Sequence, residues 1–391
     1  MTLAEQFFAL DSLLMRNRHY WQCTAFDFDA IPWGDLQDTL NNLTDDQVIA
    51  LDNDQDKLYQ FFSNHINQLD ELANLCELPS TAHAKVDYPF WLSNGIKGRK
   101  FEQLKDFVSA LPNTKQPVLE WCAGKGHLGR MLAFNGASNV HSIELQQSLC
   151  EQGQKSVQQQ GLVMHFSQAN VLKDDITQFF NTDMHAVALH ACGGLHQTFM
   201  RQASLAKVQQ ISFSPCCYHL FTANEYLAMS EVAKQSGLNL THRDLKLALQ
   251  ETVTAPSRLE KVRKTELEWR LGFDALRKSI TGEQHYASVP SVNKAIFSDS
   301  FKSFCGWAAE KKTLNIPQNT DYNKYLSIGQ ARKKITDRVE LVRHVFRRAI
   351  EVWLVLDRAL YLQQQGYRVS VKTFCEKQLT PRNILILANI H

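Results

Sequence analysis

"LEWCAGKGHLG", residues 119–129, places three glycines in a G-x-G-x-x-G spacing directly after a short apolar run. An amphipathic stretch follows the last glycine, so the pattern predicts a strand, a glycine-rich turn and a helix. Glycine lets a backbone approach a bound molecule closely, and the first turn of a helix offers N–H groups to it. We therefore expect a nucleotide-like cofactor at this turn.

Apolar runs typical of strands alternate with amphipathic runs on both sides of this turn. The seven runs cover 117–123, 139–145, 163–171, 185–194, 208–220, 367–374 and 383–390. Strands that alternate with helices at this pitch are typical of a parallel, doubly wound sheet. A single long helix, predicted over 337–366, precedes the last two strands. The chain is therefore predicted to be an α/β protein with a seven-stranded, Rossmann-like sheet.

Composition and charge narrow the class of protein. Hydrophobic residues make up 44% and charged residues 21% of the 391, as in folded soluble proteins. No apolar run could span a bilayer, the first residues lack the features of a signal peptide, and the nine cysteines show no repeated spacing. We expect a cytoplasmic protein with reduced thiols and no membrane contact. The sequence gives no oligomeric state.

Charge is unevenly divided along the chain. Residues 1–95 hold 4 basic and 15 acidic side chains, whereas the rest holds 38 basic and 25 acidic ones. A basic body suits a polyanionic partner such as RNA. Two solvated faces of opposite sign that attract each other would explain the same pattern.

Two carboxylates distinguish between the cofactors that such a glycine turn can hold. A nicotinamide dinucleotide places its pyrophosphate at the helix and requires no acid in the preceding strand. S-adenosylmethionine carries an ammonium and a sulfonium, which Glu120, four residues before the first glycine, would suit. Glu144 ends the next strand and would accept both ribose hydroxyls. We therefore expect S-adenosylmethionine.

Further cofactor contacts are expected around the same turn. The loop itself contributes Ala123, Gly124, Lys125 and Gly126. Asn170, at the end of the third strand, could contact the adenine edge or could serve as a turn residue.

Polar side chains end the fourth and fifth predicted strands, in LHACGGL (189–195) and SPCCYHL (214–220). Neighbouring parallel strands present their carboxyl ends to one ligand-binding crevice, so these side chains should converge beside the methyl donor. The candidate catalytic residues are His190, Cys192, Cys216, Cys217, Tyr218 and His219.

Four interpretations of these residues remain open. They could form a pocket wall in which His190, Tyr218 and His219 orient an acceptor, which is the interpretation we favour. A thiolate could instead attack a pyrimidine ring, as in RNA cytosine carbon-5 methyltransferases. A metal site using Cys192, Cys216, Cys217 and His219 is disfavoured, because neighbouring residues of a strand alternate sides and no C-x₂-C spacing exists. The last is packing of buried thiols.

The ordered motifs CAGKGHLGR, LHACGGL, SPCCYHL and RRAIEVWLVLDRALYL…LTPRNILILA resemble the methyltransferase-like twenty-five family and its bacterial relatives, over about residues 90–391. The chain is more distantly similar to acceptor-stem tRNA 2′-O-methyltransferases, and also to the methyltransferase part of glutathione S-transferase C-terminal-domain proteins. The resemblance implies a class I methyltransferase fold, S-adenosylmethionine as cofactor, and the glutamates, glycines, cysteines and histidines above as the site.

The resemblance also draws attention to two smaller features. Arg382 and Asn383, in TPRN, would lie on the last hairpin, where either a substrate role or a turn that satisfies its own backbone is possible. Lys100, in the basic segment before the glycine turn, could approach the cofactor or remain a solvated lysine at a helix start.

We accordingly predict an acidic helical region (1–95), a methyltransferase domain (96–221 and 336–391) and a mainly helical, basic insertion (222–335). The predicted activity is S-adenosylmethionine-dependent methylation of RNA, either tRNA or rRNA. The alternatives are methylation of a protein or small molecule, and a catalytically silent RNA-binding module on the same fold.

Overall fold

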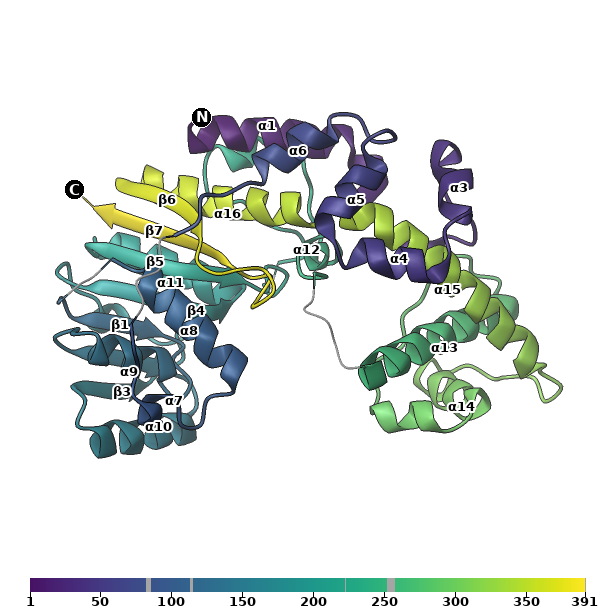
Figure 1. The fold of residues 1–391 in the computed structure, drawn as a ribbon. Helices are drawn as coiled ribbons and strands as arrows, with labels where there is room; N and C mark the ends of the chain where they lie inside the picture. Colours follow the sequence, from purple (N-terminus) through teal and green to yellow (C-terminus); the bar gives the residue numbers. More distant parts are fainter. Residues whose placement is uncertain (82–85, 113–114, 222, 252–256, 391) are drawn as a thin grey trace. The chain divides into compact units, whose positions relative to one another are not determined.

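The computed structural model of the protein describes residues 1–81, 86–112, 115–221, 223–251 and 257–390. The chain forms two compact units, and each unit draws on segments that are far apart in the sequence (Figure 1). The sheet unit comprises residues 1–16, 71–253 and 347–391. The helical unit comprises residues 17–70 and 254–346.

The sheet unit contains a seven-stranded mixed sheet, which confirms the predicted fold class. Its strands are β1 (Val118–Trp121), β2 (Val140–Glu144), β3 (Met164–Gln168), β4 (His185–Cys192), β5 (Gln210–Cys216), β6 (Tyr367–Thr373) and β7 (Ile384–Ile390). Their order is β3-β2-β1-β4-β5-β7-β6. Strand β7 lies between β5 and β6 and runs antiparallel to both.

Helices cover both faces of this sheet (Figure 1). One face packs against α8 (Gly98–Ala110), α9 (His127–Phe134) and α10 (Gln147–Gln160), and the other against α11 (Gly194–Leu205) and α16 (Arg347–Gln364). On the second face the ring of Phe199 lies 5.5 Å from Trp121 and 5.8 Å from Phe213. The alternation of buried side chains along each strand thus supplies two apolar layers.

The sheet unit also contains an N-terminal helix and several short elements. Helix α1 (Leu3–Arg16) packs on α16, where Trp353 Nε1 donates to Asp11 Oδ1 at 2.8 Å. The remaining elements are α7 (Phe90–Ser93), η2 (Thr177–Phe179), η3 (Ala233–Gln235) and α12 (His242–Leu247). Helix α6 (Leu69–Leu75) spans the boundary at residue 70.

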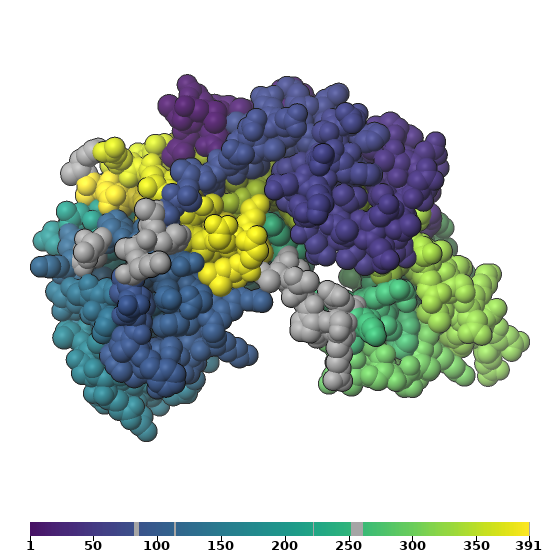
Figure 2. Space-filling model, viewed as in Figure 1, coloured from purple at the N-terminus to yellow at the C-terminus, as the bar shows by residue number. Residues whose placement is uncertain are grey.

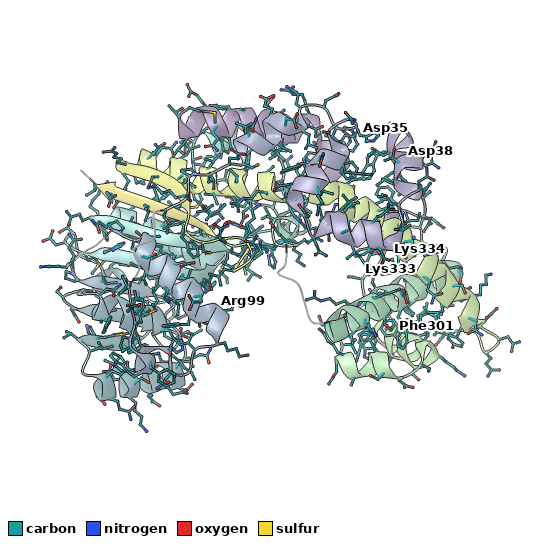
Figure 3. All side chains as sticks on the ribbon, in the orientation of Figure 1. Asp35, Asp38, Arg99, Phe301, Lys333 and Lys334 are labelled. Carbon is teal, nitrogen blue, oxygen red and sulfur yellow. The ribbon has the colours of Figure 1, made fainter. Side chains whose placement is uncertain are left out.

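The helical unit is built on two long helices, α13 (Ser257–Thr281) and α15 (Tyr322–His344). Its other elements are α2 (Arg18–Trp21), η1 (Ala25–Asp27), α3 (Gly34–Asn41), α4 (Asp45–Asp52), α5 (Gln55–Phe62), η4 (Lys294–Ser298) and α14 (Phe301–Lys311). Aromatic side chains fill the core between α13 and α14, where Trp269 lies 6.0 Å from Phe301 and 5.7 Å from Phe304. Phe301 is labelled in Figure 3.

The long helix predicted over 337–366 is interrupted. Val345 and Phe346 donate to Val342 and Arg343, three residues back, so the α-helical hydrogen-bond pattern is lost between α15 and α16. This tighter turn coincides with the boundary between the two units. The turn contains neither proline nor glycine, the usual sequence signals for such a break.

The compact units do not follow the predicted domain boundaries. The predicted N-terminal region is divided, because α1 belongs to the sheet unit and residues 17–70 to the helical unit. The predicted insertion also begins too early, because residues 222–253 belong to the sheet unit. Segments that share a hydrophobic core need not be neighbours in sequence, and this pairing of 17–70 with 254–346 has no local sequence signal.

The opposite charges of the chain meet inside the helical unit. Arg332 Nε lies 2.8 Å from a carboxylate oxygen of Asp29, and Arg338 Nη1 lies 3.3 Å from one of Asp45. The segment 17–70 packs against α15 (Figure 2), and together the two segments of the unit hold 19 Lys/Arg and 20 Asp/Glu. The basic surplus of the insertion is therefore balanced within its own unit.

None of the helices in the described parts of the chain combines the length and the apolar character that a membrane span requires.

We predict that Gly329→Ala destabilises the helical unit. An added Cβ at this position of α15 would lie 2.7 Å from the backbone nitrogen of Gly272 in α13, so the helices would have to separate. The free energy of unfolding should fall by about 1–3 kcal/mol in denaturant titrations. In the matched variant Gly306→Ala the added Cβ meets open space, and the helix should gain up to about 1 kcal/mol. Equal stability of the two variants would show that the α13–α15 crossing is not closely packed.

Candidate active site

The glycine turn between β1 and α9 adopts a left-handed backbone geometry at two of its glycines. Gly124 and Gly126 have φ angles of 60° and 67°, a left-handed conformation that glycine adopts readily. A Cβ at Gly126 would collide with the side chains of Phe166 and Met164 on β3. At Gly124 an added Cβ meets open space. The second glycine thus allows α9 to pack on the sheet, while the first leaves the turn open toward a ligand.

Glu144 is held beside this turn by two backbone groups. Its Oε2 accepts from the N–H of Gly124 at 2.9 Å, and its Oε1 accepts from the N–H of Gln146 at 3.0 Å. Each carboxylate oxygen retains a further lone pair, so both can accept a hydroxyl. The half-buried carboxylate at the end of β2 therefore fits the two ribose hydroxyls of S-adenosylmethionine.

The placement of Glu120 differs from the one expected. The side chain is 2% exposed and lies on the sheet face covered by α9, where Ser142 Oγ donates to it at 2.5 Å. Burial raises the pKa of this carboxyl to about 7, although the hydrogen bonds from Ser142 and the Gly129 N–H lower it. Glu120 therefore supports the loop from beneath, and direct contact with the cofactor's cation does not fit this position.

Lys100 and Lys125 lie near the turn and are both exposed. The pKa of His127, in the first turn of α9, falls to about 4 because of burial, and the positive charges of Arg130, Lys100 and Lys125 lower it further. Lys100, in the first turn of α8, is thus close to the glycine turn. Its predicted approach to the cofactor is compatible with this position.

Asn170 takes part in a turn of its own. Its Oδ1 accepts from the N–H of Leu172 at 3.1 Å, and its own N–H donates to Asp174 Oδ2 at 2.6 Å. This is the behaviour of a turn residue. The amide nitrogen of Asn170 and the second lone pair of its Oδ1 could still contact adenine, and that contact stays a prediction.

The end of β4 departs from regular strand geometry at His190. The residue has a φ of 66°, and the pairing of β4 with β5 shifts between Leu189 and Cys192. The exposed ring forms a hydrogen bond between its Nε2 and Oε1 of Gln103, on α8, at 3.2 Å. Gln103 was not predicted as a site residue, because it lies on a helix without any motif.

Three thiols converge at the ends of β4 and β5. The Sγ atoms of Cys192 and Cys216 are 3.4 Å apart, and the thiols of Cys192, Cys216 and Cys217 all lie within 4.8 Å of one another. The expectation that Cys216 and Cys217 point to opposite sides of a strand was wrong. Cys217 has a φ of 47°, so the chain leaves the strand geometry there and alternation no longer applies.

The thiols of this cluster differ in acidity. The pKa of Cys217 is lowered to about 6 chiefly by hydrogen bonding from Cys216, with smaller effects of Cys192 and Arg382 in the same direction. The pKa of Cys216 is raised, because its S–H group forms hydrogen bonds with the thiols of Cys192 and Cys217 and because the residue is buried. Cys217 therefore ionises before Cys216.

Tyr218 does not face the crevice, so its predicted role in orienting an acceptor was wrong. It is 1% exposed, its hydroxyl donates to the carbonyl of Pro215 at 3.3 Å, and its ring packs against the guanidinium of Arg358 at 5.0 Å. His219 is partly exposed, and its carbonyl accepts from His242 at 2.7 Å. The left-handed backbone at Cys217 changes the direction of the chain, and with it the direction in which the next side chain, Tyr218, points. The sequence does not reveal such a change of direction.

The two residues of the last hairpin have separate environments. Asn383 is buried and its Nδ2 donates to the carbonyl of Cys375 at 2.8 Å, which is the turn role considered from the sequence. Arg382 donates to the carbonyl of Glu251 at 3.3 Å and lies near Cys217. Arg382 therefore belongs to the surroundings of the thiol cluster.

Comparisons with solved structures find partial similarity to methyltransferases. The tRNA (uracil-54, C5)-methyltransferase of Pyrococcus abyssi, solved with S-adenosyl-L-homocysteine, is 19% identical, with 29% of this chain and 28% of that chain covered and a TM-score of 0.25. TrmN of Thermus thermophilus is 16% identical over 35% of this chain and 46% of that chain, with a TM-score of 0.27. Geranyl diphosphate C-methyltransferase of Streptomyces coelicolor A3(2) is 12% identical over 39% and 65%, with a TM-score of 0.26.

Sequence comparison places a known domain on the first five strands. Residues 97–224 match the family model described as "Methyltransferase domain". A glutathione S-transferase C-terminal domain-containing protein of Xenopus laevis is 33% identical over 125 residues, 31% of this chain and 19% of that protein. The chain thus spans about a fifth of this relative, and the predicted similarity to such proteins is confirmed. Residues 97–224 form a methyltransferase domain.

We predict that Glu144→Gln weakens the binding of S-adenosylmethionine at least tenfold. One carboxylate oxygen becomes an NH₂ group, which cannot accept a hydroxyl and faces a backbone N–H, and a tenfold loss corresponds to about 1.4 kcal/mol. Isothermal titration calorimetry with S-adenosylmethionine would measure the change. Glu151→Gln, an exposed carboxylate on α10, is the matched control and should retain wild-type affinity. Wild-type affinity of Glu144→Gln would remove Glu144 from the cofactor site.

We also predict a pH-dependent stability effect of Glu120. The pKa of Glu120 is about 7 in the folded protein and 4.5 in the unfolded chain. Between these two pH values only the folded state holds the proton. Stability should therefore fall as pH rises from 4.5 to 7, and Glu120→Gln should not share this loss. Relative to wild type, Glu120→Gln should gain about 1–3 kcal/mol between pH 5 and pH 7.5 in denaturant titrations. Parallel stability curves, as expected for Glu151→Gln, would mean that Glu120 is already ionised at pH 5.

Proposed function

We propose that this protein is an S-adenosylmethionine-dependent methyltransferase that acts on RNA, either tRNA or rRNA. The observation that carries the cofactor assignment is Glu144, fixed by the Gly124 and Gln146 N–H groups beside an open glycine turn in a methyltransferase domain. The cofactor supplies an activated methyl group on a positively charged sulfur. The chain's own residues have to bind it, exclude water and present the acceptor.

The residues suited to the acceptor lie at the ends of β4 and β5. His190 is exposed and is oriented by its hydrogen bond to Gln103, so its ring could take a proton from an acceptor hydroxyl or amine. Cys192 and Cys217 are partly exposed and leave a small, polarizable wall beside it. A bulky residue in this wall would restrict the approach of the acceptor to the methyl group.

RNA is favoured as the substrate by the charge near the cofactor loop. Four exposed cations lie in the first turn of α8 and the glycine turn: Lys97, Arg99, Lys100 and Lys125. Within the described parts of the chain none of the four has an ion-pair partner, and Figure 3 shows the side chain of Arg99 extending away from α8. The N-terminal end of α8 adds the positive end of a helix dipole. Such a group of cations suits a phosphate backbone.

The helical unit offers a weaker case for RNA binding. Its basic side chains are offset by an equal number of acidic ones, and several of its arginines already pair with carboxylates. The HACGG and PCC motifs, which resemble those of acceptor-stem tRNA enzymes, also lie in the sheet unit. We therefore assign RNA contact to the surface around α8 and the glycine turn.

The test is methyl labelling in lysate from a strain that lacks the protein. Purified protein and S-adenosylmethionine labelled on its methyl group should transfer label to material that RNase destroys and protease does not. Label that only protease removes, or label in small molecules, would establish the alternative substrate classes. Absence of transfer together with cofactor binding would indicate a silent module.

Measuring how tightly variants bind the RNA identified by labelling would locate the RNA surface. The double variant Lys97→Glu/Arg99→Glu should bind the labelled RNA at least tenfold more weakly and with a smaller dependence on salt, because fewer counterions are released. Lys294→Glu/Lys312→Glu, two exposed lysines of the helical unit, changes the charge equally and should have little effect. If the control weakens binding as strongly, RNA is held by net charge or by the helical unit instead.

A further inference from the structure

The thiol cluster Cys192, Cys216 and Cys217 has the composition of a metal site. Each thiol offers one sulfur, and all three sulfurs lie within 4.8 Å of one another in a group without a disulfide. Cys192 and Cys216 are register partners on adjacent strands, and Cys217 follows directly in the chain. Three soft ligands brought together from two strands match the preference of thiophilic metal ions.

The backbone around the cluster is held in place by hydrogen bonds. Gly193 donates to the carbonyl of Cys216 at 3.0 Å, and Leu220 donates to the carbonyl of Cys217 at 2.9 Å. Gly194 in turn donates to the carbonyl of Leu220 at 2.7 Å. Cys217 keeps a left-handed backbone at a cost of roughly 1–2 kcal/mol for a residue with a side chain. The convergence of the thiols thus comes from a fixed local structure.

Charge around the cluster also points to a bound cation with its thiolates. Three thiolates and one divalent ion carry a net charge of −1. Arg382 lies near Cys217, and its Nη1 is buried without a hydrogen-bond partner among the described residues. Another nitrogen of the same guanidinium group, Nη2, donates to Glu251, but a buried nitrogen without a partner is costly unless negative charge lies beside it. A metal-thiolate group would supply that charge.

We propose that Cys192, Cys216 and Cys217 bind one Zn²⁺ ion, with a fourth position open toward the crevice. In a tetrahedral zinc-thiolate site the Zn–S distance is about 2.3 Å, which separates the sulfurs by about 3.8 Å. The Cys192–Cys216 distance of 3.4 Å requires only a small adjustment. On binding, the protons still held by the thiols pass to the solvent, three Zn–S bonds form, and the ion loses all of its bound waters except one in the open position. Three protein ligands with a free position is the arrangement of catalytic zinc sites.

This site goes beyond the methyltransferase assignment, and it also explains where an acceptor could be activated. Cys192 and Cys217 are partly exposed, whereas Cys216 is buried, so the open position faces the solvent side of the strand ends. A hydroxyl, amine or thiol bound there would lose its proton more readily, because the ion stabilises the anion. This use of the ion rests on the proposed function, but its binding does not.

The test measures metal binding by the full-length chain, reduced and freed of metal with a chelator. Elemental analysis after addition of Zn²⁺ and gel filtration should give one ion per chain. Titration against a chromophoric zinc chelator should show at least a hundredfold weaker binding for Cys192→Ser, Cys216→Ser and Cys217→Ser. Cys122→Ser, a partly exposed cysteine after β1, should bind as wild type. Co²⁺ should produce a thiolate charge-transfer band in wild type and in the control alone.

Three outcomes would overturn the site. They are absence of stoichiometric zinc, equal affinity of the Cys217→Ser and Cys122→Ser variants, and a Cys192–Cys216 disulfide found by mass spectrometry in place of the metal. Binding of Cu⁺ without Zn²⁺ would overturn the choice of ion. Calorimetry with S-adenosylmethionine on the same samples shows whether each variant is folded. A chain that binds cofactor but not zinc refutes only the metal site, and a zinc-loaded chain that labels no RNA refutes only the proposed substrate.

Discussion

The active-site end of the sheet depends on two neighbouring buried charges of α16, Asp357 and Arg358. Asp357 accepts hydrogen bonds from the backbone of Met229 and Ser230 at 2.9 and 2.8 Å. Arg358 donates to His196 at 2.8 Å and to the hydroxyl of Tyr226 at 3.0 Å, and this hydroxyl donates to Asp357. A buried charge that loses its partner costs several kcal/mol. The segment that follows β5 is therefore fixed to the helix beneath it.

This anchoring has a direct consequence for the strand ends. Of the six described residues with side chains and left-handed backbones, three lie at the carboxyl ends of different central strands: Cys122, His190 and Cys217. Such conformations persist only where the surroundings determine them, and they gather at functional sites. With the chain after Cys217 held on α16, the thiols of Cys217 and Cys216 are directed to the same place as Cys192. The same network buries Tyr218 against Arg358 and keeps it out of the crevice.

The sequence predicted those parts of the structure that depend on local pattern. The alternation of strands and helices, the glycine turn and the position of Glu144 at the end of the second strand are all present. It could not predict the direction of side chains where the backbone leaves a regular strand. Glu120 keeps regular strand alternation and consequently points beneath the loop, whereas Cys217 does not. Asp357 and Arg358 are charged residues within an apolar helix, and their partners lie more than a hundred residues away, so no local pattern reveals their role.

The uneven charge of the chain left two interpretations open, and ion pairs within the helical unit support the attraction of segments of opposite sign. A basic body and an acidic N-terminal region suggested an RNA-binding insertion, but most of this opposition is neutralised inside the helical unit. The cations that remain relevant to a polyanion are those near the cofactor loop, in a sheet unit whose own net charge is small. The strand order places β4 at the switch point beside β1, between the loop that fits the cofactor and the thiols of β5. His190 and Cys192 therefore lie between the loop that fits the cofactor and the thiols of β5, where the proposed function would bring a methyl donor and an acceptor together, and local geometry supports this site better than the charge of the chain does.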